Sequence, residues 1–243
     1  MNNTLTNGFK LLELLAASNA ERSVTELTEE MGRPASHVCR LLKTLVATGY
    51  VEQNPATRKY WVSMRLLTLA HVRLANLDFR RIGHPFALRL ADDLNAAVYL
   101  SQPSRGLSIM VDVANPRDVT LDAGLVVGQI HSIRHSASGK LCAAYADLKE
   151  RKSLIEMLEE EGQPFKKSAW LAELKAIRRV GIAVRRQADL LALAVPVFQA
   201  GGIFCGALGV YFATKTKLTP AIETAARQAA GGISFALGYP IST

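Results

Sequence analysis

Cysteine is scarce in this chain of 243 residues, with Cys39, Cys142 and Cys205 its only three. They are odd in number and far apart, which argues against a disulfide framework and against a Cys-x-x-Cys metal site. No run of about 18 apolar residues is present, so no transmembrane helix is expected. The segment 1–23 starts without basic residues and carries Glu13 among its apolar positions, which predicts an amphipathic helix rather than a signal peptide. These absences favour a cytoplasmic protein without a membrane partner.

The sequence motifs of common enzyme classes are also missing. There is no Gly-x-Ser-x-Gly pattern to present a nucleophilic serine. The glycine-rich stretch 201–209 lies inside a strand-like run, where it suits phosphate binding poorly. His131 and His135 are four residues apart, but no Cys, Asp or Glu lies beside them to complete a metal site. We therefore expect no catalytic residue, no metal and no cofactor, and the chain is not predicted to be an enzyme.

The chain does have a hydrophobic fraction of 49% against 21% charged residues, which is enough for a packed core. Its formal net charge is +8, which favours polyanionic partners or anionic ligands. Residues 1–76 hold nine Lys or Arg and six Asp or Glu, a net +3, so the charge is spread along the chain. The arrangement of residues, rather than net charge, must therefore locate a binding site.

The N-terminal segment has the pattern of three short helices. Apolar residues at helical spacing predict the first over about 6–17. Ser23 and Glu26 form the capping-box signature of the second. Gly32 then suits a left-handed turn before a third helix over 35–48. Helix, glycine-containing turn and helix together predict a helix-turn-helix unit.

The polar face of the third helix is a candidate DNA-reading surface. Near its start it presents Ser36, His37 and Arg40, whose side chains suit base edges and phosphates in a major groove. Lys43 follows one turn later and suits a phosphate. The alternative is a three-helix packing unit whose basic face is merely solvated.

The next segment, 50–62, alternates around the turn sequence Asn-Pro-Ala-Thr and predicts a β-hairpin. A hairpin that follows a recognition helix is a wing. Arg58 and Lys59 at its tip suit the DNA backbone or the minor groove. The hairpin favours DNA binding over the packing-unit alternative.

Two further helices are predicted after the hairpin. Ser63 is placed to cap one that runs to about Ala75, and Asp78 is placed to cap the next, which reaches about Asn95. The apolar residues of the first suit a dimer interface. Its place between two domains also suits transmission of a signal, and the sequence leaves both roles open.

Beyond Ala97 the hydrophobic period changes to that of strands. Strands are predicted at 97–102, 107–113, 118–123, 181–186, 190–198 and 203–213. Helices are predicted at 138–146, 150–160, 170–180 and 219–237. Mixed elements of this kind predict an α/β domain with one central, mainly antiparallel sheet.

Several segments resemble the IclR family of bacterial transcription regulators. They are "VTELTEEMGRPASHVCRLLKTLVATGYVEQNPATRKYWVSMRLLTLA" (24–70), "HSASGKLCAAY" (135–145), "RVGIAV" (179–184), "LALAVPVF" (191–198) and "LGVYFATKTKLTP" (208–220). The resemblance implies a winged helix-turn-helix domain, a linker helix and a C-terminal GAF-like sensor domain. It also implies a dimer or tetramer that binds palindromic operators and responds to a small metabolite.

Two departures from the family pattern bear on function. Lys and Thr often flank the serine of the family's recognition helix, whereas Ala35 and His37 stand here, which puts more weight on His37 and Arg40. After the "VGIAV" segment the family commonly carries acidic residues and then a cysteine. Here basic residues follow, and Ala192 takes the cysteine's place, so a zinc-binding variant of the pocket is not expected.

The strand 203–213 has one bulky and one small face. The bulky face is predicted to carry Phe204, Leu208, Val210 and Phe212, and the other Cys205, Ala207, Gly209 and Tyr211. The small side chains leave room either for a ligand or for a neighbouring helix. The resemblance favours a ligand, because the family's pocket residues align with Gly209 and Tyr211.

The start of the helix near residue 138 is a second candidate ligand site. Ser138 and Gly139 are predicted to open the helix with free N–H groups that suit a carboxylate, and Ser136 adds a hydroxyl. Plain capping by serine is the alternative. The resemblance favours the ligand, because in the family this segment borders the effector pocket.

The basic residues after 184 form a third candidate. Arg185 or Arg186 suits an anionic effector, because guanidinium matches carboxylate geometry. The alternative is an exposed basic turn, which is favoured for Arg186. Leu190 and Ala192 follow on the next strand. Small Ala192 and Gly209, beside Tyr211, indicate a larger or aromatic acid.

The predicted fold class is α+β. The predicted domains are a winged helix-turn-helix over 1–63, a linker helix over 64–78 and an effector-binding GAF-like domain over 79–243. The predicted function is transcription regulation, as repressor or activator, through operator DNA and a small carboxylic acid. The alternatives are a constitutive DNA-binding regulator with a vestigial pocket and a GAF-like enzyme tethered to DNA.

Overall fold

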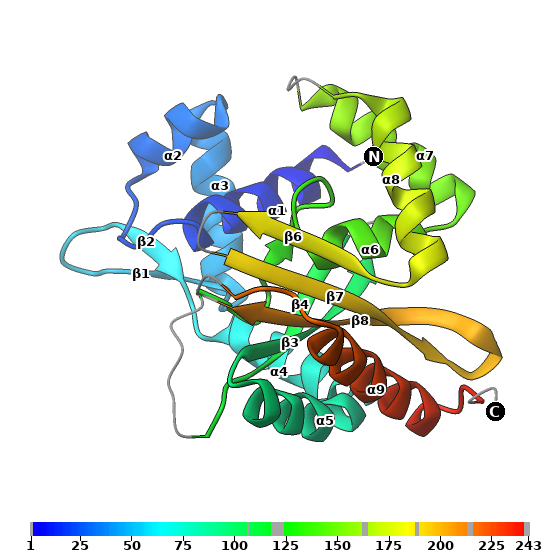
Figure 1. The fold of residues 1–243 in the computed structure, drawn as a ribbon. Helices are drawn as coiled ribbons and strands as arrows, with labels where there is room; N and C mark the ends of the chain where they lie inside the picture. Colours follow the sequence, from blue (N-terminus) through cyan, green and yellow to red (C-terminus); the bar gives the residue numbers. More distant parts are fainter. Residues whose placement is uncertain are drawn as a thin grey trace. The chain divides into compact units, whose positions relative to one another are not determined.

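The computed structural model describes residues 2–105, 107–117, 124–161, 165–187, 190–212 and 216–240 (Figure 1). The chain divides into two compact units, Met1–Leu74 and Ala75–Thr243. The division falls at the end of the helix expected to act as a linker, so that helix belongs mostly to the N-terminal unit. The finer bounds 1–63, 64–78 and 79–243 stay predictions. No helix among the described residues is long and apolar enough to cross a membrane.

The N-terminal unit is built from short helices and a small hairpin. Its elements are α1 (Asn3–Ala16), α2 (Val24–Met31), α3 (Ala35–Ala47), β1 (Val51–Gln53), β2 (Tyr60–Val62) and α4 (Arg65–Ala75). The first three helices and β1 enclose a core of Leu11, Leu15, Leu27, Met31, Val38, Leu41, Leu42 and Val51. The predicted helix-turn-helix and hairpin are therefore confirmed.

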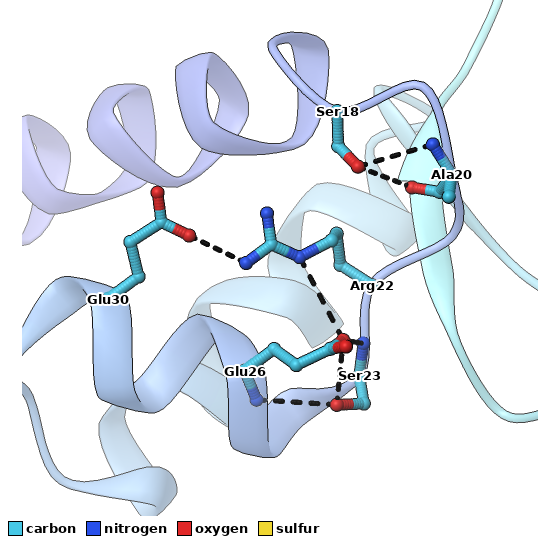
Figure 2. Close-up of polar contacts among 6 residues, drawn as sticks. All are labelled: Ser18, Ala20, Arg22, Ser23, Glu26 and Glu30. Carbon is cyan, nitrogen blue, oxygen red and sulfur yellow. Dashed lines mark hydrogen bonds and ion pairs between the residues drawn. The ribbon is translucent and has the colours of Figure 1, made fainter.

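The capping box predicted for the second helix is present at the start of α2 (Figure 2). The Ser23 hydroxyl accepts the N–H of Glu26, and the Glu26 carboxylate accepts the N–H of Ser23 at 2.6 Å. Gly32 ends the helix with a φ of 58°, a left-handed conformation that glycine adopts without strain. These local signals fix where α2 begins and ends, and so where the chain turns into α3.

One expected helix start differs in detail. Asp78 is the first residue of α5, and its carboxylate binds Arg81 at 2.7 Å instead of capping backbone N–H groups. A charged partner one turn ahead competes with the backbone for a short acidic side chain.

The C-terminal unit is a sheet with helices on both faces. Its elements are α5 (Asp78–Leu94), β3 (Ala97–Ser104), β4 (Leu107–Ala114), β5 (Ile130–His131), α6 (Ala137–Tyr145), α7 (Leu148–Glu160), α8 (Lys167–Val180), β6 (Ala183–Gln187), β7 (Leu190–Gln199), β8 (Ile203–Phe212) and α9 (Pro220–Ala236). Its described strands are ordered β5-β4-β3-β8-β7-β6, and every pair is antiparallel. The strand expected at 118–123 lies outside the described residues.

The helices divide between the two faces of this sheet (Figure 1). Gly83 of α5 packs closely against Leu100 of β3 and Ile233 of α9, so α5 and α9 cover one face. The other face carries α6 to α8, in a core that includes Leu141, Leu158, Leu174, Ala194 and Ala207. The predicted α/β sensor architecture is confirmed.

One residue lies on the opposite face of β8 from its predicted place. The pairing of β7 with β8 shifts register, because Val197 pairs with Gly206 whereas Phe198 pairs with Phe204. The extra residue, Cys205, is a β-bulge that breaks the alternation of side chains. Phe204 therefore stacks on Tyr145 of α6, with ring centroids 4.8 Å apart, instead of sharing a face with Leu208.

Replacing Ser23 with alanine should lower the free energy of unfolding of the N-terminal unit by about 1 kcal/mol, because the Glu26 N–H loses its acceptor. The chain has two tryptophans, Trp61 and Trp170, one in each unit. Urea unfolding followed by Trp61 fluorescence in a Trp170→Phe background isolates the N-terminal unit. Thr25→Ala, which changes an exposed residue of the same helix, is the matched control. Equal midpoints for the two variants would contradict the role of the cap.

Candidate DNA-binding surface and effector cavity

Three of the predicted DNA-contacting side chains form an exposed row on α3. Ser36, Arg40 and Lys43 are all exposed, and their spacing places them on one face of the helix. The opposite face carries Val38 and Leu42, which are fully buried. Burial of one face of the helix thus leaves the other, with Ser36, Arg40 and Lys43, exposed to solvent.

His37 is only partly exposed and lies between two other side chains. Its Nε2 is 3.2 Å from the side-chain amide of Asn7 in α1, and its Nδ1 is 3.4 Å from a guanidinium nitrogen of Arg40. Both partner nitrogens, Nδ2 of Asn7 and the guanidinium nitrogen of Arg40, are donors, and a neutral imidazole accepts at only one of its ring nitrogens, so His37 accepts a hydrogen bond from one of the two. His37 lies beside Arg40 in either case, and its own contact with DNA stays a prediction.

The wing turn is fastened to the connection between α1 and α2. The Glu21 carboxylate accepts hydrogen bonds from Asn54 Nδ2 and Thr57 Oγ1, both at 2.7 Å. These two bonds lower the pKa of Glu21, so its carboxylate is charged at neutral pH. The Asn54 side chain also accepts the N–H of Ala56 within the turn, at 2.9 Å. The hairpin is therefore anchored at its tip by a residue far away in the sequence.

The two basic residues predicted at the wing tip have different surroundings. Arg58 is exposed and adopts a φ of 61°, a left-handed conformation. Lys59 is half-buried and lies close enough to Glu21 and Glu26 to help lower the pKa of each carboxyl. Arg58 is thus the more available of the two for a phosphate.

A cavity of about 210 Å³ lies on the α6 face of the C-terminal sheet. It is smaller than the ~300 Å³ at which sites for drug-sized ligands begin, so it suits a compact metabolite. It is lined by Tyr99, Gly124, Leu125, Gln129, His131, Ser136, Ala137, Arg185, Leu190, Ala192 and Tyr211. The predicted residues Ser136, Arg185, Leu190, Ala192 and Tyr211 are brought together here, whereas Ser138, Gly139 and Gly209 are not part of the lining.

Ser138 and Gly139 are buried behind the cavity wall. Helix α6 begins at Ala137, one residue before the predicted start, and the Ser136 hydroxyl accepts the N–H of Gly139 at 2.9 Å. Gly139 packs against a backbone carbonyl of the preceding turn, where a Cβ would overlap. The Ser138 hydroxyl lies 2.5 Å from Nδ1 of His131. Both residues therefore shape the wall from behind instead of facing a ligand, because their polar groups are used within the protein.

Gly209 also serves the cavity indirectly. Tyr99 is its cross-strand partner, and a Cβ on residue 209 would overlap the Tyr99 ring. The space predicted for a ligand at Gly209 is therefore filled by this aromatic ring. The ring in turn lines the cavity, so the glycine decides which aromatic surface a ligand meets.

Arg185 and Arg186 are neighbours on β6, so their side chains alternate in direction. Arg185 is half-buried and lines the cavity, whereas Arg186 is exposed. Of the residues that the structure describes, none offers Arg185 a carboxylate within the 4.0 Å of an ion pair. Arg186 therefore fits the alternative of an exposed basic turn. Arg185 brings to the cavity a positive charge that has no ion-pair partner among the described residues.

His131 and Tyr99 line the cavity without having been predicted as ligand residues. Burial, followed by the positive charge of Arg185, lowers the pKa of His131 below its ordinary value of 6.5. Burial raises the pKa of Tyr99 to about 12. In the sequence, His131 was considered only as one of two possible metal ligands in "HSIRH". The alternation of residues in β3 does not distinguish Tyr99 from an ordinary core residue. Both groups are neutral at pH 7.

The exposed α3 face with its wing and the lined cavity of the second unit define a helix-turn-helix regulator with a ligand-binding domain. Residues 4–55 match the family described as "IclR helix-turn-helix domain", and residues 71–235 match "Bacterial transcriptional regulator IclR C-terminal". The chain therefore belongs to the IclR family of transcriptional regulators, as the sequence resemblance implied. It carries a DNA-binding domain and a C-terminal effector-binding domain.

Individual relatives agree with this assignment. The chain is 27% identical over 255 residues to the DNA-binding transcriptional repressor YiaJ of Escherichia coli, covering 98% of this chain and 89% of the relative. An IclR family regulator from Brucella abortus shares the fold with a TM-score of 0.80, at 23% identity, over 97% of this chain and 92% of that one. An IclR homologue from Microbacterium hydrocarbonoxydans, solved with 4-hydroxybenzoate, gives a TM-score of 0.74 at 19% identity, over 98% and 100%. These relatives are regulators, and the chain is assigned as a regulator rather than an enzyme.

The surroundings of His131 predict a pH dependence of stability. Because its folded pKa is depressed, the unfolded chain binds the proton more readily below pH 6.5, and stability falls as the pH drops through that value. For one proton the slope is at most about 1.4 kcal/mol per pH unit. Unfolding followed by Trp170 fluorescence in a Trp61→Phe background measures it. His131→Gln should flatten the dependence of stability on pH. His135→Gln, which changes an exposed histidine nearby, should leave that dependence unchanged. Identical profiles for both variants would refute this assignment.

Proposed function

We propose that this protein is a cytoplasmic transcription regulator that binds a palindromic operator as a dimer or tetramer. A small carboxylic acid in the cavity beside Arg185 changes its affinity for the operator. The observation that supports ligand binding is the half-buried Arg185 guanidinium, which has no ion-pair partner among the described residues and lies in a cavity whose described lining is otherwise uncharged. A ligand shifts DNA binding only if it has different affinities for two states of the protein.

Support for the DNA half comes from the exposed row on α3 and the anchored wing. Arg40 is exposed, yet His37 lies beside it, so less side-chain freedom is lost when it meets a base edge. Arg58 stands on a turn that Glu21 fastens, which presents its charge at a defined place. Base contacts give specificity and phosphate contacts give affinity, so these two arginines have different expected effects.

Support for self-association comes from apolar side chains exposed on α1 and α4. Leu5 and Phe9 of α1 are each 59% exposed, as is Leu67 of α4. A groove of about 610 Å³ between these helices and α3 is lined almost wholly by apolar groups, among them Leu66 and Leu69. An apolar surface of this kind is typical of an interface, and a two-fold dimer matches a palindromic operator.

The shape of the cavity favours this function over the two alternatives. A vestigial pocket would be expected to be filled by its own side chains, whereas space remains beside Arg185. A hydrolytic enzyme would need a nucleophile that reaches its substrate, whereas Ser138 is fully buried.

Arg40→Ala should lower the affinity for specific operator DNA by ~1–3 kcal/mol and should relax specificity at one base position. Arg58→Ala should weaken binding to all sequences alike and reduce the salt dependence. Fluorescence anisotropy with the DNA upstream of the protein's own gene measures both. Lys10→Ala removes an equal charge from an exposed position on α1 and is the control. If Arg40→Ala binds like Lys10→Ala, Arg40 does not read the operator.

A carboxylic acid that binds the cavity should increase the free energy of unfolding of the C-terminal unit by about 2.7 kcal/mol at a concentration of 100 times its Kd. Its unfolding temperature should rise accordingly. Arg185→Ala should weaken this binding by roughly 10- to 100-fold, because a hydrogen bond to a charged group contributes about 1.5–3 kcal/mol. Thermal shift with a panel of mono- and dicarboxylates is the measurement. Arg186→Ala, at the exposed neighbour, is the matched control. If no acid stabilises the wild-type protein, the proposal that the C-terminal unit binds a carboxylic acid is wrong.

A further inference from the structure

Arg58 at the tip of the wing has a backbone conformation that most residues avoid. Its φ is 61°, in the left-handed region where a Cβ is crowded by the following carbonyl oxygen and glycine is unstrained. Glycine and asparagine are the usual residues at such positions in hairpin turns. Arg58 is exposed, so packing in the core does not account for an arginine here. A strained residue that the core does not require is a candidate for a functional role.

Two hydrogen bonds hold the backbone of Arg58 in this conformation. Its N–H donates to the carbonyl oxygen of Asn54 at 2.8 Å, and its own carbonyl oxygen accepts from Nε2 of Gln53 at 3.0 Å. The chemistry of the partners fixes both directions, because a backbone N–H only donates and a carbonyl oxygen only accepts. Gln53 is the last residue of β1, so the strand itself supplies one of the groups that fix Arg58.

Glu21 holds the turn that precedes Arg58. Its two carboxylate oxygens accept from Asn54 Nδ2 and Thr57 Oγ1, the first and last residues of the Asn-Pro-Ala-Thr turn, both at 2.7 Å. The other end of the Asn54 side chain accepts the N–H of Ala56 at 2.9 Å, which leaves the amide nitrogen for the carboxylate. One carboxylate thus fixes both ends of the turn, and Arg58 follows directly after it.

The segment that carries Glu21 is itself attached to the helix-turn-helix. The backbone N–H and C=O of Arg22 pair with those of Tyr60 in β2, at 2.9 and 2.8 Å. The Arg22 guanidinium binds the carboxylate of Glu30, near the end of α2, at 2.6 Å (Figure 2). The wing and α2 are therefore attached to the same short segment, which limits how far Arg58 can move relative to the helices.

We infer that Glu21 and Gln53 are positioning residues for DNA binding, which act by holding Arg58 in its left-handed conformation. This inference rests on the proposed contact of Arg58 with the DNA backbone, and it assigns roles to two residues that act through Arg58. A side chain whose backbone is held before binding loses less freedom when it meets a phosphate. The strain at Arg58 and the hydrogen bonds that maintain it then have one explanation.

The charge of Glu21 makes the expected effect opposite to that of simple electrostatics. A carboxylate near the wing repels DNA phosphates, so its removal should strengthen binding if charge alone matters. Glu21→Ala should instead weaken binding about twofold to tenfold, because the turn loses both hydrogen bonds and Arg58 must be ordered when DNA binds. Glu21→Gln removes the same charge but keeps an acceptor for one of the two bonds, so it should bind more tightly than Glu21→Ala.

The test is fluorescence anisotropy of the full chain with two duplexes, the sequence upstream of its own gene and an unrelated sequence at low salt. Glu21→Ala and Gln53→Ala are each measured in the wild-type protein and in an Arg58→Ala background. If these residues act through Arg58, the loss of affinity should appear only where Arg58 is present. Glu52→Ala, which removes an equal charge from an exposed position of the same hairpin, is the matched control for Glu21→Ala.

Replacement of Arg58 itself tests the strain. Arg58→Gly and Arg58→Ala both remove the side chain, so they should bind DNA equally weakly. Only glycine relieves the left-handed strain, so Arg58→Gly should have the higher urea midpoint of the two. Trp61 fluorescence in the Trp170→Phe background measures the midpoint. Equal midpoints would mean that the position is unstrained, and the inference would be wrong.

The outcomes separate the positioning roles from the function on which they rest. If the wild type binds neither duplex, or Arg58→Ala binds as tightly as wild type, the proposed DNA contact fails and the positioning roles fail with it. If Arg58→Ala weakens binding but Glu21→Ala weakens it equally in both backgrounds, Glu21 only supports the fold, and its positioning role alone is wrong. A gain in affinity by Glu21→Ala, like that expected of Glu52→Ala, would also overturn that role. A loss confined to protein that retains Arg58, on both duplexes, would establish it.

Discussion

The cavity of the C-terminal unit depends on a steric constraint between two neighbouring strands. Gly209 has no side chain, and the Tyr99 ring occupies the space where a Cβ would lie. The Tyr99 ring lines the cavity, and it meets the ring of His131 edge-on. Gly209, which is not part of the lining, thus determines which aromatic surface the cavity presents. Any larger residue at 209 would move the ring, and with it the hydrogen bonds behind the cavity wall.

The two units hold their candidate binding side chains in the same way. In the N-terminal unit, His37 lies between Asn7 and Arg40, and Glu21 fastens the wing that carries Arg58. In the C-terminal unit, the buried Ser138 hydroxyl lies within hydrogen-bond distance of Nδ1 of His131. In each case residues distant in the sequence meet a short polar segment and limit its freedom. Such restraint lowers the entropy that binding must overcome, so specificity is built in before the partner arrives.

Much of the fold could be predicted because its signals are local. Ser23 with Glu26, and Gly32 after them, mark the boundaries of α2 within a few residues, and the alternation of apolar residues marks most of the sheet. The site was predictable only in part. Ser136 and Arg185 carry recognisable chemistry, whereas the roles of Gly209 and His131 follow from contacts across the sheet that no spacing encodes. The bulge at Cys205 likewise arises from pairing between strands, so Phe204 was assigned to the wrong face.

The strand order suggests how a bound acid affects the protein. Arg185 lies on β6 and His131 on β5, and these are the two edge strands of the described sheet. Among the described strands, each edge strand is hydrogen-bonded to one neighbour, so these strands are restrained less than the strands between them. Arg185 and His131 line one cavity, so a carboxylate held by both residues would join the two edges. The acid would then bind more tightly to a state of the protein in which the two edge strands are close together than to a state in which they are apart. A ligand shifts an equilibrium between two states only through such a difference in affinity.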